Sequence, residues 1–196
     1  MRIVLVHGYK ASPQQNFWPW LGSALRERGH DVIAVDLPNP EAPNCQEWVQ
    51  AISQAVLRPG GDTIFIAHSL GCVALLHYLE NAEMSGTPKT VILVAPPYYI
   101  GSEKFASFFS PPIDFDTVMW KGQEFAVIAA KDDDVIPFDH AQKYERELNG
   151  NLYALEGGKH FLEAKDLPLI LELIDSRDVE PGESLSNDFG DIDVVV

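Results

Sequence analysis

The chain has 196 residues, is 46% hydrophobic, and carries 14 Lys and Arg against 29 Asp and Glu, which gives a formal net charge of −15. This length predicts one domain with a sizeable core. The negative charge argues against nucleic-acid and anionic-membrane partners, because both need basic patches. Two cysteines are too few for a disulfide framework. We expect a cytoplasmic protein, because the sequence has neither a signal-peptide pattern nor an apolar run of transmembrane length.

Strand-like and helix-like segments alternate along the chain. Several strand-like runs are apolar throughout, which is typical of parallel strands covered on both faces. These runs are residues 2–6, 31–36, 63–67, 90–95, 124–129 and 152–155. Helical spacing and capping residues mark residues 17–28, 45–57, 71–80, 139–148 and 167–174. The alternation predicts a three-layer α/β/α sandwich with a mostly parallel sheet of about six strands.

The last segment differs in composition from the rest. Seven acidic residues and one basic residue lie between Asp175 and Val196. We therefore expect one α/β domain over residues 1–175 and an acidic C-terminal tail over residues 176–196. The apolar end, Val194 to Val196, could dock on the domain or pair as an edge strand.

The junction after the third predicted strand reads Ala67-His68-Ser69-Leu70-Gly71. A small-x-Ser-x-Gly segment between a strand and a helix is typical of a nucleophile elbow, although alanine here replaces the usual first glycine. A serine that merely caps the helix is the alternative. The pattern favours Ser69 as a catalytic nucleophile.

A serine nucleophile needs a base and an orienting carboxylate, which follow it in the order acid, then histidine. Three aspartates, residues 132–134, follow the fifth predicted strand. His160 is the one histidine beyond the last predicted strand, whereas His140 lies at a helix start, where the dipole disfavours a protonated base. His7 and His68 are expected to orient the motif loops.

Two backbone amides should stabilise the oxyanion of the reaction. The residue after the nucleophile, Leu70, supplies one, and Tyr9 in the loop after the first strand is expected to supply the other, with Gly8 allowing close approach. A simple glycine turn that ends the strand is the alternative. Neither loop carries a dinucleotide or phosphate-binding motif, and the aspartates lack a calcium-loop pattern, so we expect no cofactor and no metal.

Several segments together resemble the small serine hydrolases of the α/β-hydrolase superfamily, the YdeN-like and retinoblastoma-binding-protein-nine-like proteins. These segments are HGYKASPQQNFWPWL, DLPNPEAPNCQEWV, IAHSLGC, AKDDDVIP and GGKHF. The resemblance implies a compact sheet and Asp133 as the catalytic acid, four residues before Pro137, with Asp132 and Asp134 as open alternatives. Some relatives bind the retinoblastoma protein through L-x-C-x-E. Residues 70–74 lack the glutamate, so that partner is not implied, and any protein partner is unknown.

The interval Pro96–Gly122 is short and rich in aromatic residues, so we expect a minimal lid. It either lines an acyl pocket or packs on the sheet through Phe105, Phe108 and Phe109. The sequence as a whole predicts a carboxylesterase-like serine hydrolase that cleaves ester or related acyl bonds of small substrates through Ser69, His160 and Asp133. An amidase or thioesterase, and a binding or regulatory protein on a hydrolase scaffold, are the alternatives.

Overall fold

A computed structural model describes residues 1–176 and 193–195. The predicted acidic tail, residues 176–196, lies almost wholly outside the described residues. Within it the backbone of one short strand, β7 (Asp193–Val195), is described, and it pairs antiparallel with Leu152–Ala154. The division between domain and tail therefore stays a prediction.

The sheet forms the centre of the molecule, with the strand order β2-β1-β3-β4-β5-β6-β7. The first six strands are all parallel to their neighbours. Their bounds are β1 Arg2–Val6, β2 Asp31–Val35, β3 Thr63–His68, β4 Thr90–Val94, β5 Phe125–Ala130 and β6 Asn151–Leu155. Strands β3, β4 and β5 are buried along their whole length, because helices cover both faces of a parallel sheet. The predicted mostly parallel sheet of about six strands is confirmed.

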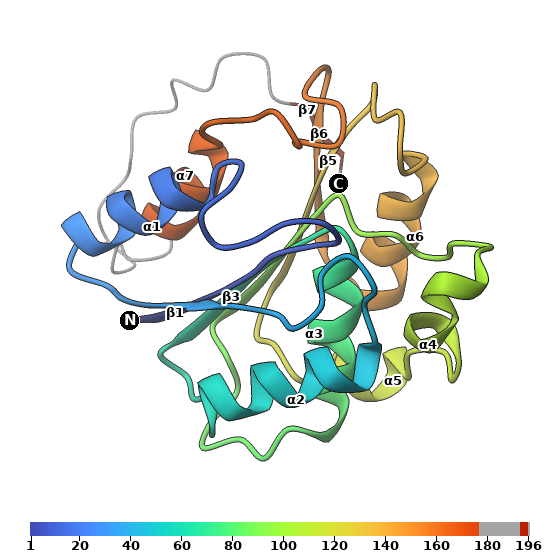
Figure 1. The fold of residues 1–196 in the computed structure, drawn as a ribbon. Helices are drawn as coiled ribbons and strands as arrows, with labels where there is room; N and C mark the ends of the chain where they lie inside the picture. Colours follow the sequence, from blue (N-terminus) through green and yellow to red (C-terminus); the bar gives the residue numbers. More distant parts are fainter. Residues whose placement is uncertain (177–192, 196) are drawn as a thin grey trace.

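Helices cover the sheet on both faces (Figure 1). One face carries α1 (Trp18–Glu27) and α7 (Pro168–Asp175). The other face carries α2 (Cys45–Val56), α3 (Leu70–Asn81) and α6 (Asp139–Leu148). A buried apolar cluster fills each of the two interfaces. The three-layer arrangement predicted from the sequence is therefore confirmed.

The segment between β4 and β5 forms a small cap. It contains a 3₁₀ turn η1 (Glu103–Phe105) and two short helices, α4 (Ala106–Phe109) and α5 (Phe115–Val118). Both interpretations of its aromatic residues are partly correct. Phe108 is fully buried and packs edge-on against Trp48, with ring centroids 5.2 Å apart, whereas Phe105 lines the cavity described below.

The strand order reverses between β1 and β3, since β1 pairs with β2 on one side and with β3 on the other. In open α/β sheets ligands bind at such a switch point, beyond the carboxyl ends of the strands. The loops that follow β1 and β3 therefore meet where a site is expected. These loops contain Tyr9 and Ser69.

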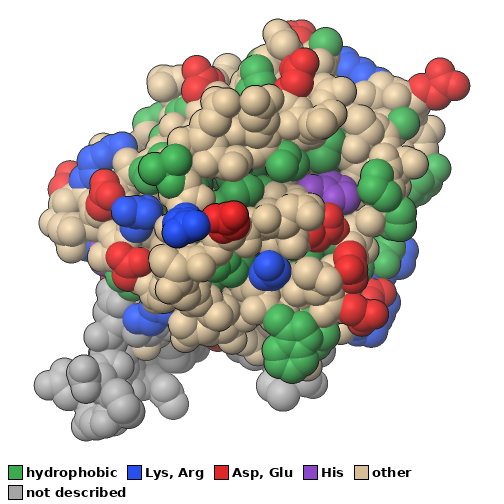
Figure 2. All heavy atoms as spheres, turned by 90° about the horizontal axis from the view of Figure 1, so that it is seen from below, with side chains coloured by type: hydrophobic (Ala, Val, Ile, Leu, Met, Phe, Trp, Pro, Cys, Tyr) green, Lys and Arg blue, Asp and Glu red, His purple; other side chains and the backbone are tan. Residues whose placement is uncertain are grey.

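The surface carries charges of both signs. On the face shown in Figure 2, acidic and basic side chains lie interspersed rather than gathered into a basic patch. Among the described residues, no helix combines the length and the hydrophobicity needed to cross a membrane.

Candidate active site

Ser69 lies in a sharply bent connection between β3 and α3. It is the single residue between them, and its backbone has φ 52° and ψ −130°, a region that non-glycine residues rarely adopt. A Cβ on Gly71 would lie 2.1 Å from the carbonyl oxygen of His7, and one on Gly8 would lie 3.0 Å from the Cβ of Ser69. Both glycines are therefore required for the loop after β1 to pack directly against this bend.

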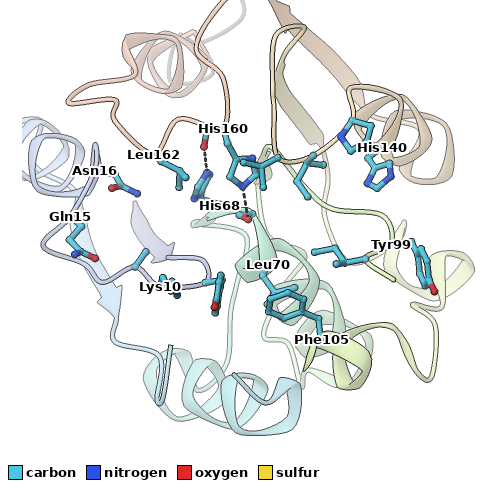
Figure 3. A pocket seen from close by; sticks show the side chains of 17 residues that line it. Lys10, Gln15, Asn16, His68, Leu70, Tyr99, Phe105, His140, His160 and Leu162 are labelled. Atoms are coloured by element: carbon cyan, nitrogen blue, oxygen red, sulfur yellow. Dashed lines mark hydrogen bonds between the residues drawn. The ribbon is translucent and has the colours of Figure 1, made fainter. Parts of the chain in front are cut away.

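Three predicted side chains meet at this bend. His160 Nε2 lies 2.8 Å from Ser69 Oγ, a contact that a dashed line marks at His160 in Figure 3. His160 Nδ1 lies 2.8 Å from Asp133 Oδ2. His160 Nδ1–H donates a hydrogen bond to the Asp133 carboxylate, which leaves Nε2 free to accept the hydrogen bond of the serine hydroxyl. The side chains of His160 and Asp133 are only 4% and 3% exposed, so bulk water is largely kept from this hydrogen-bonded line.

Asp133 is held as a carboxylate by its donors. Burial by itself raises the pKa of this group, but hydrogen bonds from His160, Ile136 and Val135 outweigh that effect and lower the pKa overall. The backbone amides of Val135 and Ile136 donate to Oδ1 at 2.8 and 2.9 Å. With Oδ1 occupied in this way, Oδ2 is directed at the imidazole.

The two neighbouring aspartates have other partners. Asp132 Oδ1 accepts a hydrogen bond from the backbone amide of Lys159 at 2.9 Å, which ties the loop before His160 to the loop after β5. Asp134 is exposed and lies 4.0 Å from Lys159 Nζ. Of the three aspartates that the sequence offered, only Asp133 is hydrogen-bonded to the histidine.

Contacts with the core hold the loop that carries His160. The ring of His68 is buried, and its Nε2 donates to the carbonyl oxygen of His160 at 2.9 Å. Burial lowers the pKa of His68 to about 3, so this ring stays neutral. Lys159 and Phe161, on either side of His160, have φ of 49° and 57°, and Phe161 is buried in the core beside α7. These contacts set the direction of the His160 imidazole.

His7 fixes the loop that follows β1. Its Nε2 accepts from the backbone amide of Leu37 at 3.0 Å, while its Nδ1 donates to the carbonyl oxygen of Gly8 at 2.9 Å. Burial is the main reason that the pKa of His7 is lowered. A neutral ring suits this arrangement, because a protonated Nε2 could not accept the amide. His7 and His68 thus orient the motif loops, as expected from the sequence.

The two predicted oxyanion donors lie beside Ser69. Tyr9 and Leu70 both line the same cavity as the serine. Leu70 is the first residue of α3, so its amide has no acceptor within the helix. Within the described part of the chain, the amide of Tyr9 donates to no other group. Both amides are therefore available for a ligand.

The cavity has about 580 Å³ of space and two unlike sides (Figure 3). Lys10, Gln15 and Asn16 come from the loop between β1 and α1 and form a polar side. Tyr99 and Phe105, together with Ile100 and Ile136, form the apolar side, whereas Leu162 lies beside Asn16 in Figure 3. His160 lies between the two (Figure 3). Among the described residues, no group of three or more His, Cys, Asp or Glu side chains is arranged to hold a metal ion.

Sequence reasoning missed part of the cavity wall. The sequence places His140 at a helix start and gives it no role in the site, but it lines the cavity, and its Nδ1 accepts from the backbone amide of Tyr98 at 3.1 Å. The pKa of His140 is lowered, chiefly by burial. Gln15, Asn16 and Leu162 carried no signal beyond lying in the loops next to the motifs.

Comparison with known proteins places the chain in a family. The model of the serine hydrolase family matches residues 3–169. YdeN of Bacillus subtilis (strain 168) is 29% identical over 184 residues, which cover 89% of this chain and 95% of that protein. The crystal structure of the ydeN gene product matches with a TM-score of 0.85 at 28% identity, covering 89% of this chain and 97% of that one.

Two more distant likenesses agree with this result. The serine hydrolase RBBP9 of Rattus norvegicus is 22% identical over 148 residues, or 74% of this chain and 77% of that protein. Est1E from Butyrivibrio proteoclasticus has a TM-score of 0.69 at 12% identity, covering 90% of this chain and 86% of that one, a likeness that concerns the fold alone. The resemblance inferred from the sequence is confirmed.

Proposed function

This chain belongs to the serine hydrolase family, and on that premise we propose that it hydrolyses carboxylic ester bonds of small substrates through an acyl-enzyme intermediate on Ser69. One observation supports the proposal above all others. The hydroxyl of Ser69, the imidazole of His160 and the carboxylate of Asp133 are joined by two contacts of 2.8 Å each. This is the arrangement that a serine needs to become a nucleophile.

Each step has a group to carry it out. His160 Nε2 takes the proton of Ser69 Oγ as the oxygen attacks the ester carbonyl carbon. The amides of Tyr9 and Leu70 donate to the oxyanion that forms. The bond to the leaving alkoxide then breaks, and His160 returns the proton to that oxygen. A water molecule then attacks the carbonyl carbon of the acyl-enzyme while His160 takes its proton. The acid is released, and His160 returns the proton to Ser69 Oγ.

The alternatives use the same residues in different ways. An amide or a thioester can pass through the same intermediate, so the choice of an ester follows proteins of similar fold that are described as esterases, among them an esterase domain from a Rhodothermus marinus protein. A purely binding protein would need no hydroxyl activated by a base, and the short contact between Ser69 and His160 argues against it. We still expect the protein to lie in the cytoplasm and to act on a small acyl substrate. We also expect it to need no cofactor and to bind neither nucleic acid nor a membrane.

Replacing the serine tests the proposal. We expect Ser69→Ala to lower kcat on p-nitrophenyl butyrate by about 10⁴-fold or more, because the nucleophile is lost. The substitution removes only the hydroxyl oxygen, which is hydrogen-bonded to His160, so the far-ultraviolet circular dichroism should stay that of the parent protein. Ester hydrolysis that survives in this variant at the parent rate would contradict the proposal.

A further inference from the structure

One charged side chain lines the cavity. Lys10 is the only Lys, Arg, Asp or Glu among the described residues of its wall. It follows Tyr9, the proposed oxyanion residue, and its Nζ lies 5.5 Å from the centroid of the Tyr9 ring. The polar side of the cavity is therefore positive at Lys10.

A second lysine lies on the same ring. Lys104, at the start of the cap, donates to the Tyr9 hydroxyl at 2.7 Å, and its Nζ lies 4.5 Å from the ring centroid. The neighbouring Phe105 packs edge-on against Tyr9, with ring centroids 5.1 Å apart. Two ammonium groups from opposite sides of the site thus flank one phenol at the rim of the cavity.

Neither ammonium group has a counter-ion in the described part of the chain. Arg28, Arg58 and Lys143 each form an ion pair with a carboxylate, but Lys10 and Lys104 form none with any described residue. With 29 Asp and Glu in the chain, carboxylates are abundant elsewhere on the molecule. Both lysines are exposed, their Nζ atoms lie 5.5 and 4.5 Å from one ring centroid, and an anionic ligand bound there would be attracted by both charges.

Lys10 has a backbone conformation that glycine adopts more easily than lysine. Its φ is 54°, in the left-handed region that favours glycine. Its amide donates to the carbonyl oxygen of Pro40 at 3.0 Å, which fixes the residue in this conformation. A lysine kept in a strained position on the cavity wall points to a use for its side chain.

Building on the esterase activity proposed above, we infer that the preferred substrate is an ester that carries a carboxylate or similar anionic group. The anion lies at Lys10, with Lys104 adding to the positive field, and the uncharged part lies against the apolar side of the cavity at Ile100 and Ile136. The net charge of −15 repels anions from a distance. That repulsion is screened beyond roughly 10 Å at 0.1 M salt, whereas contact with Lys10 is not.

Matched pairs of substrates test this inference. The acyl arm compares mono-p-nitrophenyl glutarate with p-nitrophenyl butyrate, and the alcohol arm compares para-carboxyphenyl acetate with phenyl acetate. In each pair the ratio of kcat/KM for the anionic ester to kcat/KM for the neutral ester is measured. We expect the parent protein to favour the anionic ester in one arm, which also identifies the side of Ser69 that faces Lys10.

The variants assign that preference to a residue. Lys10→Gln should lower the ratio by about tenfold, because the charge that contacts the anion is lost. Lys121→Gln is the control, because it removes the same charge far from the cavity. Lys121 precedes β5 and so lies towards the amino ends of the strands, whereas the cavity lies beyond their carboxyl ends. This variant should leave the ratio unchanged. Lys104→Gln should lower the ratio less than Lys10→Gln.

The result separates the two proposals. If hydrolysis requires Ser69 but the ratio in Lys10→Gln equals the parent ratio in both arms, the anionic substrate is refuted and the esterase proposal stands. If no ester in either arm is hydrolysed in a manner that requires Ser69, the proposed function itself fails, and the inference fails with it.

Discussion

Three neighbouring aspartates show how much the surroundings of a residue decide its role. Asp132, Asp133 and Asp134 are chemically identical, and reasoning from the residues alone left all three open. Hydrogen bonds separate them, since one accepts from a backbone amide, one from His160, and one lies exposed near Lys159. Only the family resemblance favoured Asp133 in advance, because the direction of each side chain depends on a turn that local sequence preferences do not specify.

Asparagine substitutions at these positions should have unequal effects. We expect Asp133→Asn to lower kcat by about 10⁴-fold, because an amide cannot hold His160 in the required tautomer or stabilise its protonated form. We expect the other two substitutions to leave kcat close to that of the parent protein. Asp132→Asn keeps an oxygen that can accept from the Lys159 amide, and Asp134→Asn removes only an exposed charge. Steady-state kinetics on p-nitrophenyl butyrate provide the measurement, and a loss in Asp134→Asn equal to that in Asp133→Asn would contradict the assignment.

The element that matters most is the β3–Ser69–α3 unit. The sequence predicted a strand over residues 63–67 and a helix over residues 71–80, and the structure extends them to Thr63–His68 and Leu70–Asn81. The bend is therefore tighter than the sequence indicated. The cap was less predictable, because α4 and α5 have four residues each, too few to show helical periodicity.

Two glycine substitutions compare the bend with an ordinary helix. Gly71→Ala places a Cβ 2.1 Å from the backbone oxygen of His7, so we expect the free energy of unfolding to fall by at least about 2 kcal/mol. In Gly22→Ala, in α1, the added Cβ lies 3.1 Å from the flexible end of Arg26 and 3.9 Å from Leu5 Cδ1, which is an ordinary contact distance. This substitution should raise the free energy of unfolding by roughly 0.5–1 kcal/mol, because alanine favours a helix.

Urea unfolding followed by circular dichroism gives both values. The comparison is matched because each variant adds one methyl group to a helical glycine. A Gly71→Ala protein as stable as the parent would show that the loop after β1 does not pack against α3 as described.

The fold of the whole molecule can be predicted from the pattern of apolar runs more readily than the shape of the site. Continuous apolar strands alternating with amphipathic helices were enough to predict the layers and the parallel sheet. The strand order and the paths of the loops around the cavity were not predictable in this way, because they depend on contacts between residues distant in the chain. The positions of His140 and Leu162 in the cavity wall were unpredictable for that reason.

Buried histidines should make the stability of the whole molecule depend on pH. An unfolded histidine takes a proton near pH 6.5, whereas burial keeps His68 neutral down to about pH 3. Below pH 6.5 the unfolded state therefore binds more protons, and the free energy of unfolding falls by up to about 1.4 kcal/mol per pH unit for this one group. His7, whose pKa is also lowered by burial, acts in the same direction.

Urea unfolding of the parent protein and of His68→Gln between pH 5 and pH 7.5 measures this effect, a range set by the histidine titration. Glutamine can still donate to the carbonyl oxygen of His160 but does not titrate, so its stability should fall less steeply with decreasing pH. Asp133 does not interfere in this range, because its pKa is lowered from a value already below it. Equal pH slopes in the two proteins would rule out His68 as a source of the dependence.

Reaction with a fluorophosphonate probe tests the central claim most directly, because such a probe phosphonylates a serine only where a base has activated it. Intact-mass measurement followed by peptide mapping should find one adduct, located on Ser69, and none in Ser69→Ala or in heat-unfolded protein. A folded protein that remains unlabelled, or an adduct located on another residue, would contradict the claim that His160 and Asp133 activate Ser69.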